Sequence, residues 1–474
     1  MSVNNTDLVL RVAIDIPLRK TFDYSVAKDR AGPALQPGCR LRLPFGNKQV
    51  TGVLLETHRE TSQFKLKPIE SALDDEPLLS SRLLDLLKWA ADYYCHPLGE
   101  VIFTALPALL RQGRPARQAT IRRWQSVDQQ AIATDLGRAP KQRALLALLS
   151  QYPDGLSEAE INEKFSNWRQ PMQALAEKRR VIVTEQQSPS LLPRYQDAGL
   201  TLNSQQQAAI DTITHSLELF ACYLLYGVTG SGKTEVYIQL AREALARQRQ
   251  VLILVPEIGL TPQLATRFHK RFGAGIAILH SGLNDTERTE AWLNARSGKA
   301  QIIIGTRSAV FVPLRAPGLI IIDEEHDSSF KQMEGFRYSA RDVAIKRAAM
   351  LNIPVILGSA TPSLEALNNA RNGKFTMLQL PERAGESSHP QQVLLNMQGI
   401  KPVAGLSPQA LKAIERELDQ DGQALIFLNR RGYAPTYRCE SCGWIAECHH
   451  CDVRLTLHRR DSRLRCHVCS YETT

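Results

Sequence analysis

The residues with the most specific chemistry in this chain of 474 form a glycine-rich loop that ends in lysine and threonine. Glycines in such a loop let backbone N–H groups turn toward phosphate oxygens without a Cβ clash, and the N-terminus of a following helix adds partial positive charge. The lysine is spaced to reach the β- and γ-phosphates of ATP, and the threonine to hold Mg²⁺. The predicted ATP-binding loop comprises Gly227, Val228, Thr229, Gly230, Ser231, Gly232, Lys233 and Thr234.

A pair of carboxylates supplies the groups that hydrolysis of ATP would need. The apolar run at 319–322 ends in Asp323 and Glu324, and catalytic groups in open α/β sheets lie at the carboxyl ends of strands. We predict that Asp323 binds Mg²⁺ together with Thr234, and that Glu324 polarises the attacking water. A simple acidic turn is the alternative, and the phosphate loop upstream disfavours it. Lys233, Asp323 and Glu324 are therefore the candidate catalytic residues.

Both motifs require strands that deliver them to one edge of a sheet. An apolar run before the loop predicts a strand at 223–226, and a helix is predicted at 235–246. Further apolar runs alternate with helical segments, which is typical of a doubly wound parallel sheet. These predicted strands lie at 251–255, 276–279, 301–304, 319–322 and 355–357.

Six of the nine cysteines form three Cys-x-x-Cys pairs near the end of the sequence. In a reducing compartment this spacing favours tetrahedral zinc coordination over disulfides. The pairs are Cys439 with Cys442, Cys448 with Cys451, and Cys466 with Cys469.

Composition points to a basic, multidomain protein. There are 58 lysines and arginines against 48 aspartates and glutamates, a net charge of +10, which favours a polyanionic partner without excluding a merely solvated basic surface. No apolar run approaches the roughly 18 residues of a membrane span, and the first residues lack the features of a signal peptide. We expect a cytoplasmic protein with no membrane partner.

The chain divides into six predicted segments with a multidomain α/β fold. Short strands at 8–55 and a helix at 78–94 indicate an α+β domain, and three short helices before a strand at 181–184 suggest a winged helix. A Gln-, Ser- and Pro-rich stretch suggests a linker. The segments are 1–110 (α+β domain), 111–185 (winged helix), 186–200 (linker), 201–385 (parallel-sheet domain), 386–438 (a further α/β unit, with a helix at 408–418 and a strand at 424–428) and 439–474 (cysteine-rich).

Motifs at the strand ends resemble, in order, those of superfamily-two helicases. After Gln206 and the phosphate loop come VPEIGLT at 255–261, GTRS at 305–308, DEEH at 323–326 and GSATP at 358–362. The resemblance implies that 201–385 is a RecA-like helicase lobe and that Gln206 pairs with the adenine edge. It also implies that Thr306 and Arg307 contact a single-stranded phosphate backbone.

Aromatic and basic side chains alternate in the segment that follows the acidic motif. Phe330, Phe336, Arg337 and Tyr338 lie around Gly335 in a polar stretch. Such residues are suited to stacking on nucleobases. Core packing is an equally good interpretation of the rings alone, but aromatics around a glycine in a polar loop favour the DNA contact.

These motifs, HSGL at 280–283, TFDY at 21–24 and the cysteine cluster together resemble the PriA family, the replication-restart helicases also called primosomal protein N′. The resemblance covers essentially the whole chain. It implies a 3′-DNA-end-binding domain, a winged helix, and two helicase lobes with a zinc-bearing insertion in the second. The implied activity is ATP-dependent 3′–5′ unwinding with recognition of stalled forks and D-loops, and reloading of the replicative helicase. Implied cofactors are ATP, Mg²⁺ and Zn²⁺; implied partners are forked and single-stranded DNA, primosome proteins and single-stranded-DNA-binding protein.

The same resemblance implies a pocket for a 3′ DNA terminus. Its lining would comprise Phe22, Asp23, Tyr24, Gly46 and Lys67, with Asp23 accepting a hydrogen bond from the terminal hydroxyl. From the residues alone, Phe22 and Tyr24 fit the buried face of a strand better, and both interpretations stay open.

The sequence departs from the family pattern near its end. Family members run on past residue 474, so we expect a C-terminally truncated member without the arginine fingers of the second lobe, which are worth about 10³ to 10⁵ in rate. The resemblance places Cys448, Cys451, Cys466 and Cys469 on one zinc and leaves Cys439 and Cys442 in an incomplete second site. We expect binding of ATP and forked DNA with poor unwinding; a non-catalytic scaffold that binds forks is the alternative.

Overall fold

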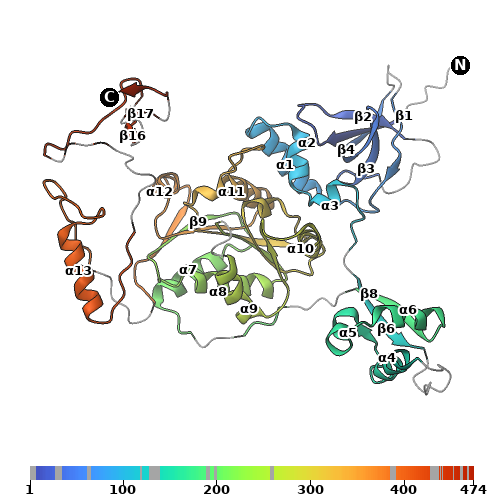
Figure 1. Cartoon of the computed structure of the whole chain (residues 1–474). Helices are drawn as coiled ribbons and strands as arrows, with labels where there is room; N and C mark the ends of the chain where they lie inside the picture. Colours follow the sequence, from blue (N-terminus) through green and yellow to red (C-terminus); the bar gives the residue numbers. More distant parts are fainter. Residues whose placement is uncertain are drawn as a thin grey trace. The chain divides into compact units, whose positions relative to one another are not determined.

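The computed structural model contains two compact units, residues 1–387 and 388–474 (Figure 1). It describes residues 7–26, 35–60, 66–117, 120–127, 139–187, 193–196, 200–256, 261–384, 391–427, 437, 439, 441–451, 453–458, 463–466 and 469–473. Among these residues, none of the helices has the length and apolar character needed to span a bilayer.

A parallel sheet of seven strands forms the centre of the first unit, in the order β11-β12-β10-β13-β14-β9-β15. All the strands predicted between 201 and 385 are confirmed, and β15 is an additional edge strand. The bounds are β9 (Cys222–Gly227), β10 (Gln250–Leu254), β11 (Ile276–Leu279), β12 (Ile302–Gly305), β13 (Pro317–Asp323), β14 (Val355–Ser359) and β15 (Thr376–Leu380).

Helices cover both faces of this sheet because its strands are apolar on both sides. In β10, Val251 and Ile253 face one core cluster, whereas Leu252 and Leu254 face the other. The first cluster includes α7 (Ser204–Thr214), α8 (Lys233–Ala246) and α9 (Thr261–Phe272); the second includes α10 (Asp285–Ser297), α11 (Ala340–Leu351) and α12 (Leu364–Arg371).

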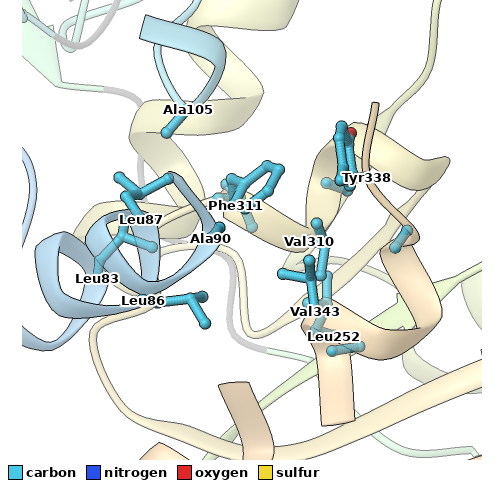
Figure 2. Packing of buried hydrophobic residues seen from close by; sticks show 14 of the residues in the cluster. Leu83, Leu86, Leu87, Ala90, Ala105, Leu252, Val310, Phe311, Tyr338 and Val343 are labelled. Carbon is cyan, nitrogen blue, oxygen red and sulfur yellow. The ribbon is translucent and has the colours of Figure 1, made fainter. Parts of the chain in front are cut away.

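The N-terminal domain combines an antiparallel sheet, β2-β1-β4-β3-β5, with three helices. Its helices α1 and α3 pack against α11 and α10, which cover one face of the parallel sheet, so that Leu87 and Ala90 lie in the same buried cluster as Phe311 (Figure 2). Its core is therefore continuous with that of the parallel-sheet domain. The bounds are β1 (Asp7–Ile14), β2 (Phe22–Ser25), β3 (Arg40–Phe45), β4 (Lys48–Glu60), β5 (Ser71–Ala72), α1 (Ser81–Tyr93), α2 (Leu98–Thr104) and α3 (Ala108–Arg111).

A small domain with its own core follows. Three helices accompany an antiparallel sheet in the order β7-β6-β8. The three helices and the last strand agree with the elements expected here, and the winged-helix assignment stays a prediction. The bounds are β6 (Thr120–Ser126), α4 (Pro140–Ser150), β7 (Leu156–Ser157), α5 (Glu158–Lys164), α6 (Arg169–Glu177) and β8 (Val181–Gln187).

Part of the predicted linker is attached to the parallel-sheet domain by hydrogen bonds. The backbone N–H of Arg194 donates to Phe272 O over 2.9 Å, and the Tyr195 hydroxyl accepts from Gln239 Nε2 over 2.9 Å. The guanidinium of Arg271 lies 5.1 Å from the Tyr195 ring centroid. The described residues 193–196 are thus attached to α8 and the end of α9.

The second unit contains α13 (Pro408–Asp419), as predicted, and a sheet of β16 (Thr456–His458), β17 (Arg463–Arg465) and β18 (Glu472–Thr473). The predicted strand at 424–428 is wrong for the described residues 424–427, which form no strand. Leu425 is 97% exposed and Phe427 83%. An apolar run becomes a strand only when a neighbour accepts its backbone hydrogen bonds, and no described strand does so here.

Candidate functional site

The predicted phosphate loop connects β9 to α8, in the strand-loop-helix arrangement expected from its sequence. Gly230 and Gly232 have φ of 83° and 81°, in the left-handed region that glycine tolerates. A Cβ on Gly232 would lie 2.3 Å from Gln206 Nε2, and one on Gly227 would lie 2.5 Å from Ser231 Oγ. Any side chain at Gly227 or Gly232 would therefore clash with neighbouring side chains, and the loop forms a narrow cradle only with glycine at these positions.

Lys233 lies inside this cradle. Its Nζ donates to Gly227 O over 2.8 Å, and the side chain is buried. Burial lowers the pKa of Lys233, while the charges of Glu324 and Asp323 act in the opposite direction. The charges of the two carboxylates therefore act on the lysine, and the catalytic roles of the three residues stay a prediction.

Asp323 is brought beside the loop by the strand order β13-β14-β9. The Tyr237 hydroxyl donates to Asp323 Oδ1 over 3.0 Å from the first turns of α8. Burial raises the pKa of the Asp323 carboxyl, Glu324 raises it further, and the Tyr237 hydrogen bond lowers it. Gly358, opposite Asp323 in β14, leaves room for the tyrosine, since a Cβ there would lie 1.7 Å from Tyr237 Oη.

Glu324 follows the strand in a conformation that is rare for a residue other than glycine. Its φ is 49°, and such strain is concentrated at functional sites. His326 Nδ1 lies 3.6 Å from Glu324 Oε2 and 2.8 Å from Ser359 Oγ, and the backbone N–H of Thr361 donates to Ser359 Oγ over 2.9 Å. Polar contacts thus connect the acidic motif to the GSATP motif.

The loop residues fit a bound polyphosphate and its metal. Ser231 Oγ is buried and has no hydrogen-bond partner among the described residues, an unmet need that a phosphate oxygen would satisfy. The Thr234 hydroxyl accepts only a long contact, 3.4 Å, from Arg267 Nη1. Val228, Thr229 and Gly230 complete the loop.

Gln206, expected to pair with adenine, is held by its own surroundings. Its Nε2 donates to Ser231 O over 2.9 Å, and its Oε1 accepts from the Asn203 N–H over 3.0 Å. The side chain is 3% exposed. In this conformation Gln206 supports the phosphate loop, and the adenine contact stays a prediction.

The residues expected to contact a DNA backbone on this lobe are only partly accessible. Thr306 is buried, and Arg307 Nη1 donates to Ser329 O over 3.2 Å. The motif at 255–261 lies largely outside the described residues, because the description stops at Pro256 and resumes at Thr261.

The three loop aromatics that were expected to contact DNA are instead core residues, which was the alternative interpretation. Phe330, Phe336 and Tyr338 are 3%, 6% and 3% exposed and belong to the core shared with the N-terminal domain. Phe336 stacks on Tyr338 at 4.8 Å and meets Tyr94 edge-on at 5.8 Å. Their faces are covered by protein, so they offer no stacking surface to a base; Arg337, by contrast, is exposed.

The residues of the expected 3′-end pocket gather at one end of the N-terminal sheet. Phe22 packs against Phe45, next to Gly46, with ring centroids 5.3 Å apart, and the Ser25 N–H donates to Lys67 O over 3.0 Å. Asp23 is exposed but already accepts from Arg11 Nε over 3.1 Å. Tyr24 is buried in the sheet's core, so its ring belongs to the strand's inner face.

Four of the six paired cysteines form a metal-binding group. The sulfurs of Cys448, Cys451, Cys466 and Cys469 all lie within 4.8 Å of one another, as four thiolates on one tetrahedral ion require. Cys439 and Cys442 are not part of this group. The four cysteines that were expected to share one zinc thus lie together.

Three features of the site were missed from the sequence. Tyr237 and Gly358, from elements next to β13, determine the surroundings of Asp323. The sequence held one sign of this contact: Tyr237 lies on the apolar face of a predicted helix, and a buried tyrosine hydroxyl needs a hydrogen-bond partner. The third acid of the motif is structural: the buried Glu325 accepts from the Ser363 N–H over 2.7 Å and from Arg341 Nη1 over 3.0 Å.

Three family models match this chain. The 3′ DNA-binding domain model matches residues 11–107, the DEAD/DEAH box helicase model residues 203–370, and the PriA DNA helicase Cys-rich region model residues 448–473. They correspond to the N-terminal domain, the helicase lobe and the four-cysteine group.

Curated relatives extend this similarity across the chain. Replication restart protein PriA of Haemophilus influenzae is 41% identical over 98% of this chain and 64% of its own length. Replication restart protein PriA of Bacillus subtilis is 31% identical over 97% of this chain and 67% of its own length. The chain thus spans about two thirds of the length of these relatives. It belongs to the PriA family of replication restart helicases.

Proposed function

We propose that the chain binds and hydrolyses ATP in response to DNA, as the ATP-dependent 3′–5′ helicase of a replication-restart primosome that recognises forks and D-loops. The observation that carries the proposal is the convergence of the phosphate-loop lysine with two carboxylates at one edge of the parallel sheet. Amides and an ammonium suit the phosphates, and carboxylates suit Mg²⁺.

In this mechanism the chain's own residues position the reactants. Thr234 and Asp323 would hold Mg²⁺, which supplies charge neutralisation at the phosphates when bound. Lys233 would move from Gly227 O to the phosphate oxygens, and Glu324 would orient the attacking water. Tyr237 fixes Asp323, so that little reorganisation is required at the moment of reaction.

The remaining assignments support a protein that acts on DNA ends. The match to a 3′ DNA-binding domain model supports a pocket for a 3′ terminus near Phe22, Asp23, Gly46 and Lys67. Residues 111–185 are proposed to form a winged helix. The four-cysteine group is proposed to bind Zn²⁺, because tetrahedral thiolate sites select this ion.

DNA-stimulated ATP hydrolysis tests the proposal. Turnover that rises with forked DNA and vanishes in Lys233→Ala supports the enzyme. Equal background rates in the two proteins would leave the second candidate, a scaffold that binds forks without turnover. In that case both proteins should bind forked DNA equally well and in a salt-sensitive manner. The exposure of Leu425 and Phe427, which pair with no described strand, favours that candidate.

A further inference from the structure

A cleft of about 330 Å³ lies between the N-terminal domain and the helicase sheet. One wall consists of residues 104–108 and Arg111, at the ends of α2 and α3. The other consists of residues 279–281 and 306–309, with Arg288 and Gln332. The cleft therefore joins the loop after β12, where DNA contacts are expected, to a domain that matches a DNA-binding family.

The two walls are fixed with respect to each other by packing. Trp292 is buried under the cleft, and its Nε1 donates to Ala105 O over 2.9 Å. Leu106 and Val312, from opposite walls, belong to one buried cluster. The cleft is thus part of a continuous core and is formed before any ligand arrives.

The charged side chains that line this cleft are all positive. Three arginines line it, namely Arg111, Arg288 and Arg307, and its described lining residues include no carboxylate. Desolvation lowers the pKa of Arg111, Asp15 raises it, and Arg288 lowers it again. Arg111 and Arg288 thus present two positive charges to a preformed cleft, of which Asp15 offsets a part, and an anion bound between them is stabilised.

Both guanidiniums are anchored and retain donors. Arg111 Nε donates to Leu106 O over 2.7 Å, and Arg288 Nη2 donates to the carbonyls of His280 and Ser281, each over 3.2 Å. A guanidinium has five N–H donors. The remaining donors, with the hydroxyls of Ser281 and Ser308, suit the oxygens of a phosphate group.

We propose that this cleft binds one phosphodiester group of single-stranded DNA as the strand passes from the helicase lobe to the N-terminal domain, with Arg111 as the contact from that domain. The inference rests on the proposed function, because it takes the ligand to be DNA. The inference adds one contact to that function: a single phosphate of the strand forms a bridge between the two domains.

Binding of a fluorescent 20-nucleotide oligothymidylate to the full chain, measured by anisotropy over a range of salt concentrations, tests this bridge. Losing one phosphate contact on a single strand makes the slope of log affinity against log salt shallower by about 0.7. We expect this change in Arg111→Gln, and in Arg288→Gln from the opposite wall, with weaker binding at each salt concentration. Arg111→Lys keeps the charge and should restore most of the slope.

The matched control is Arg82→Gln, an exposed arginine at the start of α1 outside this cleft, which should leave the slope unchanged. ATP binding, measured on each variant, verifies that the lobe is folded. Parental slopes in both Arg111→Gln and Arg288→Gln would overturn the inference. Absence of oligonucleotide binding by the parent would instead overturn the proposed DNA function. If the cleft is instead a site for free phosphate, Arg111→Gln should abolish the binding of inorganic phosphate and leave the salt dependence of oligonucleotide binding unchanged. That result would also contradict the proposed bridge.

Discussion

The helicase lobe and the cysteine-rich unit position their functional groups by different means. In the lobe, two buried clusters on the faces of a seven-stranded sheet bring Lys233, at the start of α8, and Asp323, at the end of β13, together although they are far apart in sequence. In the second unit, a small cluster around Ala446, Leu455 and Leu464 surrounds four thiols. A large core holds a site rigid without its ligand, whereas a small one depends on the ion that it binds.

Metal removal should separate the two regions most clearly. Structural zinc contributes about 10 to 16 kcal/mol in small domains, so a strong chelator is expected to unfold the segment around residues 446–473 and leave the lobe intact. Limited proteolysis together with ATP binding measures this. Loss of ATP binding on chelation, or a segment that stays protease-resistant without metal, would contradict the comparison.

A substitution in the helicase lobe should have the opposite pattern of effects. Gly358→Ala places a Cβ 1.7 Å from Tyr237 Oη, and overpacking of a core typically costs about 1 to 3 kcal/mol. We expect a lower free energy of unfolding and weaker Mg²⁺-dependent ATP binding, with zinc content unchanged. The same substitution in a Tyr237→Phe background, where the hydroxyl that the Cβ would meet is absent, is the control. Equal losses in the two variants would mean that the tyrosine contact is unimportant.

Tyr237→Phe should have a smaller effect. It removes one hydrogen bond to Asp323 and keeps the buried ring, a loss of roughly 1 kcal/mol. Chemical denaturation measures the stability, and ATP titration measures the function. We expect the affinity for ATP to fall in the presence of Mg²⁺ and to be preserved in EDTA. An equal loss of affinity with Mg²⁺ and in EDTA would argue against a role of Tyr237 through Asp323.

Asp323→Asn should give the smallest change, and with the opposite sign. Burial raises the pKa of Asp323 above its usual value near 3.8, so the folded state binds its proton more tightly than the unfolded state. The charged carboxylate therefore destabilises the fold above its folded-state pKa, and this cost vanishes below pH 3.8. The variant is expected to be more stable than the parent at neutral pH. A difference that grows toward acid pH would contradict this assignment.

The fold of the lobe was largely predictable because its strands are continuous apolar runs, which need cover on both faces. The convergence of Lys233 with Asp323 was predictable for the same reason, since the loop before Lys233 follows the end of β9, Asp323 ends β13, and the two strands are parallel. The arginine-rich β6 was not recognised, because its composition lacks the apolar alternation of a strand. Residues 424–427 were mistaken for a strand, because an apolar run does not reveal whether a partner is present.

The aromatic loop shows the main limit of the sequence. Phe336 and Tyr338 follow a polar segment, yet they are covered by Tyr94 and Phe311, from α1's end and from the segment after β12. Contacts between segments so distant leave no periodic signal in either one. Tyr237 and Gly358 were missed for a related reason, since their fit is made across two neighbouring elements.

The most direct measurement of the central claim is the affinity for ATP with and without Mg²⁺ in the parent and in Asp323→Asn. If the phosphate loop and Asp323 form one nucleotide–metal site, Mg²⁺ tightens ATP binding in the parent and has much less effect in the variant, while both bind ATP equally in EDTA. The same tightening by Mg²⁺ in both proteins would show that Asp323 does not share the metal with the nucleotide and would contradict the account.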